Sequence, residues 1–120
     1  MFRRIISPRL VDIVEAIERI ELALRGTTLD AFELSWEKRW LVERGVEIVS
    51  EASRHLPDAL KERNPQIPWR KVAGIGNILR HDYARIASDV LWKLAKDDLP
   101  VLERACRVEL AAALKQEQGQ

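Results

Sequence analysis

Apolar residues recur at helical spacing along most of the chain. Between residues 10 and 24 they fall one, three or four positions apart, while charged residues fill the opposite face. The apolar set is Leu10, Ile13, Val14, Ile17, Ile20 and Leu24. Ser7 is predicted to cap this helix, Pro8 to occupy its first position and Gly26 to end it.

A second, longer helix is predicted from Ser35, after a capping run at residues 27–30 and a short helical turn at 31–34. We expect Trp36 and Trp40, four positions apart, to share a face. Core packing is the more common fate of such a pair, and a dimer surface is the alternative. Gly45 indicates a close helix crossing or a bend. The predicted apolar stripe comprises Trp36, Trp40, Leu41, Gly45, Ile48, Val49, Ala52 and Leu56.

The second half of the chain predicts two more long helices. Residues 57–60 open another helical turn, and the run 64–68, with prolines at 65 and 68, ends it. A third helix begins at Pro68-Trp69 and carries Val72, Ala73 and Gly76 on one side, while Gly74 and Gly76 allow close backbone approach. A fourth begins at residues 87–89, carries Val90, Leu91, Leu94 and Ala95, and kinks or restarts at 97–100. Its stripe continues through Leu102, Cys106, Leu110 and Ala113, and residues 116–120 are expected to fray.

No strand-like alternation and no internal repeat interrupts this pattern. The prediction is therefore an all-α, up-and-down bundle of four to five helices, forming a single domain over residues 1–120 with its core at about 8–115. The apolar stripes are wide and the chain holds four tryptophans. A homodimer would cover the surplus apolar surface.

The composition narrows the class of protein. A chain of 120 residues with 47% hydrophobic and 32% charged residues is large and apolar enough to fold as one domain. Its one cysteine, Cys106, rules out an internal disulfide and a cysteine-based zinc site; it is expected to be a buried, inert thiol. No apolar run approaches ~18 residues and no signal-peptide core is visible, so a cytoplasmic location without a membrane span is expected.

Positive charge gathers in one part of the sequence. Between Ser53 and Arg85, seven Lys or Arg residues stand against three Asp or Glu, a net charge of +4, although the whole chain carries only +1. Such a local excess attracts polyanions or nucleotides, although a merely solvated face is the alternative. Arg70, Lys71 and Arg85 are the candidate phosphate or RNA contacts within this stretch.

Residues 80–83 place an arginine, a histidine, an aspartate and the only tyrosine next to one another. The imidazole of His81 can move a proton near neutral pH, and the guanidinium of Arg80 can hold a phosphate. Each residue also has a purely structural alternative: His81 could cap a helix, Arg80 could be a surface charge, and Tyr83 could lie at the edge of the core. The second histidine, His55, is expected to be a solvated helix position.

The segment Ile67–Tyr83 resembles the region around the active motif of HepT-like proteins, a branch of the HEPN superfamily, and the likeness extends over about residues 8–115. The family motif is an arginine, four to six residues, a histidine, one residue and a tyrosine. His81, Asp82 and Tyr83 match its second half, and Asn77 matches a polar residue usually found before an apolar pair. The family arginine would stand at Gly76, whereas here Arg80 directly precedes the histidine.

The resemblance implies a small all-α protein that dimerises, so that two copies of the motif face each other in a cleft. It implies a metal-independent endoribonuclease toxin of a type VII toxin–antitoxin pair, without a cofactor. The antitoxin would be a minimal nucleotidyltransferase that adenylylates Tyr83. His81 would be the catalytic base and Arg80 the phosphate-holding cation, supported by Asn77 and Asp82. The alternative is a non-catalytic HEPN module that docks a nucleotidyltransferase or binds a nucleotide.

Overall fold

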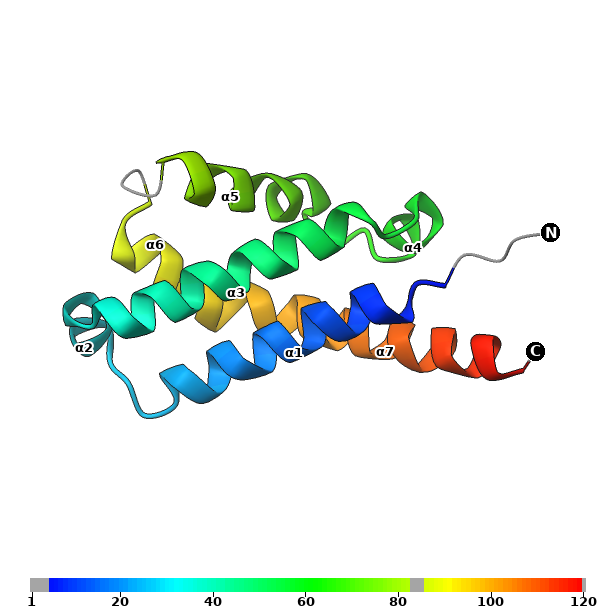
Figure 1. Cartoon of the computed structure of the whole chain (residues 1–120), viewed down its shortest axis with the longest axis horizontal. Helices are drawn as coiled ribbons and strands as arrows, with labels where there is room; N and C mark the ends of the chain where they lie inside the picture. Colours follow the sequence, from blue (N-terminus) through cyan, green and yellow to red (C-terminus); the bar gives the residue numbers. More distant parts are fainter. Residues whose placement is uncertain (1–4, 83–85, 120) are drawn as a thin grey trace.

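The computed structural model describes residues 5–82 and 86–119, and all regular structure within these ranges is helical. Four long helical segments run up and down side by side, which confirms the predicted all-α class (Figure 1). They are α1, α3, α5 and the consecutive run of α6, η2 and α7, while α2 and α4 are short connecting helices. The bounds are α1 Ser7–Leu24, α2 Leu29–Leu34, α3 Trp36–Arg54, α4 Asp58–Arg63, α5 Trp69–Asp82, α6 Ser88–Lys93, η2 Leu94–Asp98 and α7 Leu99–Gln118.

Short-range turn chemistry sets the first helix boundaries. Gly26 adopts a positive φ of 73° just after α1, a conformation that glycine reaches without strain. Thr28 caps α2 by accepting a hydrogen bond from the Ala31 N–H at 3.1 Å. Ser35 caps α3 by accepting one from the Lys38 N–H at 3.2 Å. Thr28 lies within the predicted capping run, and α3 begins directly after Ser35, the residue from which the longer helix was predicted.

The start of α1 and the end of α7 differ from the prediction. The helix-capping position before α1 is Ile6, and Ser7 is already helical. Its hydroxyl instead donates to Glu117 Oε1 at 2.7 Å, which joins the start of α1 to the end of α7 (Figure 1). The α7 helix continues to Gln118, so the predicted fraying from residue 116 is wrong. A side-chain contact to a distant helix holds this last turn.

A π-helical turn joins α6 to α7. In η2 the backbone N–H of Leu99 donates to the Leu94 carbonyl, five residues back, immediately before Pro100. Proline has no N–H to donate, and the regular α-helical hydrogen bonding changes to one π-helical turn directly before it. The predicted kink or restart at residues 97–100 is therefore confirmed.

The core lies where α3 packs between α1 and α5, and where α7 covers the other side of α1. An added Cβ at Gly45 would lie 2.6 Å from Ile20 Cδ1, so α1 and α3 cross closely there, as predicted. The side chain of Phe32 is fully buried and contacts Trp92, with ring centroids 5.4 Å apart.

The predicted placement of Trp36 and Trp40 in the core is wrong. Their side chains are 61% and 64% exposed, and they pack edge to face on each other with ring centroids 4.8 Å apart. The predicted Gly45, Val49, Ala52 and Leu56 are buried, and Val42 and Val46, which were not predicted, are buried with them. Val90 of α6, also expected in the core, is 54% exposed. No helix in the described ranges is long and apolar enough to cross a membrane.

Candidate functional site

The α5 helix, which carries the motif, is seated on α3 through one buried serine. Ser50 Oγ donates to the Ala73 carbonyl at 2.7 Å and accepts from the Gly76 N–H at 3.2 Å. Arg54 donates to the same carbonyl through Nε at 3.1 Å and Nη2 at 2.8 Å. Ser50 is only 1% exposed, so these bonds satisfy a polar group inside the core. They fix α5 one turn before Asn77.

Gly76 is a point of close approach between α5 and α3. An added Cβ would lie 2.6 Å from Ser50 Oγ and 2.7 Å from Ser50 Cβ. The position at which the resemblance would place an arginine therefore faces the helix–helix contact. Gly74, which was also expected at a close contact, has nothing within 4 Å of an added Cβ, so that expectation is wrong within the chain.

One face of α5 points away from the bundle. Its members stand at positions i, i+4, i+7 and i+11, which a helix of 3.6 residues per turn brings onto one side. All are exposed, and we call this set the outer face of α5: Arg70, Gly74, Asn77 and His81. Among the described residues, none forms a hydrogen bond or ion pair with the side chain of Arg70 or His81. The predicted base, the supporting Asn77 and one candidate phosphate contact thus share one solvent-facing surface.

Arg80 lies on a different side of α5. It lines a groove of about 160 Å³ between α1, α3 and α5, together with Arg44, Glu47 and Glu51. A hydrogen bond from His55 holds the pKa of Glu51 below its usual range, and the charges of Arg54 and Arg80 lower it further. Successive helical residues project about 100° apart. Within one protomer, Arg80 therefore faces the carboxylates of α3, while His81 faces solvent.

The remaining candidates are spread around the same helix. Lys71 lines a groove of about 250 Å³ on the opposite flank, beside Asp98 and the start of α7. Asp82 is the last residue of α5 and is exposed. Tyr83 and Arg85, the predicted modification site and a candidate RNA contact, lie outside the described residues.

Arg39 of α3 binds the segment of residues 86–88, which follows the motif and leads into α6. Its guanidinium donates to the carbonyl of Ile86 and, at 2.6 Å, to the hydroxyl of Ser88, and its Nε pairs with Glu43 at 2.5 Å. Both side chains of the ion pair are largely buried, at 22% and 15% exposure. Sequence reasoning missed this residue, because a charged residue in an amphipathic helix gives no sign of a distant partner.

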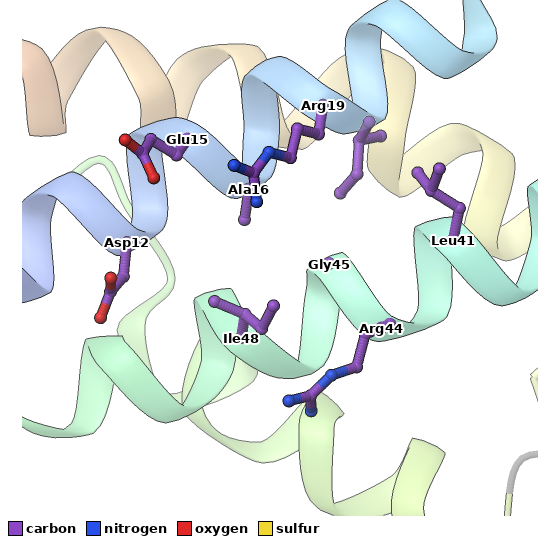
Figure 2. Close-up of a pocket in the computed structure, with 9 residues that line it drawn as sticks. Asp12, Glu15, Ala16, Arg19, Leu41, Arg44, Gly45 and Ile48 are labelled. Atoms are coloured by element: carbon purple, nitrogen blue, oxygen red, sulfur yellow. The ribbon is translucent and has the colours of Figure 1, made fainter.

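Another groove lies between α1 and α3 and has a volume of about 300 Å³. Figure 2 shows the acidic Asp12 and Glu15 and the basic Arg19 on α1 across from Leu41, Arg44 and Ile48 on α3. It shares Arg44 and Ile48 with the groove that Arg80 lines. None of the motif residues that the structure describes lines this groove.

Two other predicted features can be compared with the structure. Cys106 is 1% exposed, and burial, followed by the charge of Glu109, raises its pKa to about 12, as expected for an inert thiol. His55 is exposed at the end of α3 beside Glu51, as predicted. No group of three or more His, Cys, Asp or Glu side chains within residues 5–82 and 86–119 is arranged to hold a metal ion.

Comparison with known proteins gives one consistent result. Residues 13–109 match the model of the family described as "Ribonuclease HepT-like". A Thermococcus cleftensis protein named "Probable ribonuclease HepT" is 39% identical over 94 residues, which is 78% of this chain and 86% of the relative. A Methanocaldococcus jannaschii protein named "Putative RNase MJ1380" is 31% identical over 108 residues, covering 90% of this chain and 99% of the relative. No solved structure matches the chain. With its helical fold and His-x-Tyr motif, the chain belongs to the HepT-like ribonuclease family.

Proposed function

We propose that this protein is an endoribonuclease that cleaves RNA without a metal ion and that His81 moves the proton in the reaction. One observation carries the proposal: in a chain of the HepT-like family, His81 is solvent-exposed on the same face of α5 as Asn77 and Arg70. An RNA strand lying on that face would bring its 2′-hydroxyl within reach of the imidazole. The ribonuclease names of the relatives support the same substrate.

The chemistry requires a base and a cation. The imidazole of His81 takes the proton from a 2′-hydroxyl, whose oxygen attacks the adjacent phosphorus. The bond from phosphorus to the 5′-oxygen breaks, and that oxygen takes up a proton. The products are a 2′,3′-cyclic phosphate and a 5′-hydroxyl end. A guanidinium that holds the charge developing on the phosphate oxygens typically contributes about 10²–10³ in turnover.

We propose that this guanidinium is Arg80 and that it comes from a second copy of the chain. Arg80 and His81 of one protomer lie on different faces of α5, so one phosphate cannot easily contact both. A twofold axis beside α5 would allow Arg80 of one protomer to meet the phosphate bound at His81 of the other. The exposed pair Trp36 and Trp40 supplies apolar surface that such a homodimer would cover.

We propose further that the protein is the toxin of a toxin–antitoxin pair whose antitoxin is a minimal nucleotidyltransferase. The tyrosine of the His-x-Tyr motif, Tyr83, would be the modified residue. Its hydroxyl oxygen would attack the α-phosphorus of ATP, forming a bond to AMP as pyrophosphate leaves. An added nucleotide two residues from His81 would block the approach of RNA. Intact mass and peptide mapping of protein co-expressed with that partner would test the modification.

The test of the ribonuclease uses the two histidines of the chain. His81→Ala is expected to lower the rate of RNA cleavage by about 10²–10⁴, whereas His55→Ala, at an exposed position on α3, leaves it unchanged. Cleavage is expected to persist with a chelator present. Equal cleavage by both variants, or complete inhibition by the chelator, would refute the mechanism.

Gly76 supports a second candidate, a non-catalytic module that docks the nucleotidyltransferase or binds a nucleotide. The position at which the family motif supplies its arginine is glycine in this chain, and a side chain there would collide with Ser50. In this case purified protein would form a stable complex with the nucleotidyltransferase or bind a nucleotide and show no RNA turnover.

A further inference from the structure

No contact within the described part of the chain requires a glycine at position 74. It lies in the middle of α5, where glycine is a poor helix former, yet an added Cβ would meet nothing within 4 Å. Gly76, two residues later, is needed for the contact with α3. A bare stretch of exposed helix backbone at Gly74 is useful when something outside the chain approaches it closely.

The neighbours of Gly74 indicate what approaches. Arg70 lies four residues before Gly74 and His81 lies seven residues after it on the same face, with Asn77 between Gly74 and His81. The α5 helix carries three basic residues against one acidic residue, a net charge of +2 with the histidine neutral. The outer face itself carries one full positive charge, on Arg70, and no acidic residue, and such a face favours a polyanion over a basic protein surface.

Resting on the proposed function, we propose that the outer face of α5 is a track for the backbone of single-stranded RNA. The scissile phosphate lies at His81, the strand crosses the bare backbone at Gly74, and Arg70 holds a phosphate several nucleotides away. From residue 70 to residue 81 the helix rises about 16 Å, at 1.5 Å per residue. That length accommodates several nucleotides at the ~3.4 Å per-strand spacing of a stacked helix.

The experiment measures binding, so that it does not depend on cleavage. The probe is a fluorescent 2′-O-methyl oligonucleotide of about 10 nucleotides, which lacks the attacking hydroxyl. Gly74→Ala is expected to raise the melting temperature, because alanine is the better helix former, and yet to weaken binding several-fold. Arg70→Ala is expected to weaken binding roughly eightfold at about 50 mM salt and to reduce the salt slope by about 0.7, the value for one phosphate contact.

Arg104→Ala is the matched control, since it removes an equal charge from an exposed position on α7. It is expected to bind the probe nearly as tightly as the wild type. The proposed RNA track would be refuted if Gly74→Ala bound the probe as tightly as the wild type. It would also be refuted if Arg70→Ala and Arg104→Ala lost equal affinity for the probe. Dissociation of a dimer by Gly74→Ala with RNA binding intact would also overturn it, in favour of a protein partner on this face. Failure of the ribonuclease mechanism would appear only as lack of cleavage, with this binding pattern retained.

Discussion

Gly74 and Gly76 of α5 form a matched pair for testing how this helix is positioned. The same substitution, glycine to alanine, is made two residues apart in one helix. At Gly74 the new methyl group enters open space, and at Gly76 it meets the side chain of Ser50. The two variants share the gain in helix propensity and differ in the contact with α3.

The size of the difference follows from the contacts. Alanine is better than glycine in a helix by roughly 0.5–1 kcal/mol, and Gly74→Ala should gain about this much. At Gly76 the new Cβ would lie 2.6 Å from Ser50 Oγ, which is itself held by hydrogen bonds at 2.7 and 3.2 Å. Overpacking costs about 1–3 kcal/mol, and each hydrogen bond lost costs about 0.5–1.5 kcal/mol. Gly76→Ala should therefore be destabilised by roughly 1–3 kcal/mol.

Urea unfolding followed by circular dichroism gives both free energies. The double variant Ser50→Gly/Gly76→Ala is the decisive control, because it moves the small residue from one helix to the other and restores the space. It should regain part of the stability that Gly76→Ala loses, while still lacking the serine hydrogen bonds. Equal stability of the two alanine variants would refute the close contact, as would a double variant no more stable than Gly76→Ala.

The same contact predicts the outcome of restoring the family arginine. In Gly76→Arg the long side chain would start at the α3 contact, so it could reach solvent only if α5 moved away. We expect this variant to be less stable than Gly76→Ala and to cleave RNA no faster than the wild type. A stable variant with faster cleavage would show that position 76 can face the phosphate after all.

Three further predictions concern stability and thiol chemistry. The Cys106 thiol, whose pKa is about 12, should resist alkylation until the protein unfolds. Between pH 7 and pH 10 the free energy of unfolding of the wild type should fall by roughly 1.4 kcal/mol more than that of Cys106→Ala. A hydrogen bond from Arg63 lowers the pKa of Glu109, so its contribution is complete above the ordinary value of 4.5 and is lost as the pH falls through the lower folded value; Glu109→Gln should flatten the acid side of the stability curve. Arg39→Ala should lower the free energy of unfolding by about 1–3 kcal/mol, while Arg44→Ala, 71% exposed, should change it by less than about 0.5 kcal/mol.

Helix boundaries were predictable because they depend on neighbouring residues. Gly26 and the caps Thr28 and Ser35 act through their own backbone conformation or through an N–H three residues away. Pro100 marks a restart for an equally local reason, its missing N–H. The end of α7 could not be predicted in this way, because Ser7, more than a hundred residues earlier, contacts its last turn.

The buried face of α3 was predicted correctly only in its second half. Gly45, Val49 and Ala52 of the predicted stripe are buried, whereas Trp36 and Trp40 at its start are exposed. Ser50 and Ser53 are also buried although they are polar, because Ser53 Oγ donates to the Ser50 carbonyl at 2.7 Å and Ser50 bonds across to α5. Polar residues whose hydrogen bonds are satisfied by a neighbouring helix look like surface positions in a sequence.

The geometry of the motif within its own helix could also be predicted from the sequence, whereas its contact with α3 could not. Its residues can be recognised in the sequence, and helical geometry alone separates the directions of Arg80 and His81 by about 100°. What the sequence cannot give is that the inner face of α5 is closed at Gly76 by Ser50. With that face occupied, and with Arg70 about 16 Å along the helix from His81, the cation for the scissile phosphate is left to Arg80, on the flank that meets the carboxylates of α3. A second copy of the chain can bring the flank of one α5 to the outer face of the other, and this is the physical reason to expect activity only in the dimer.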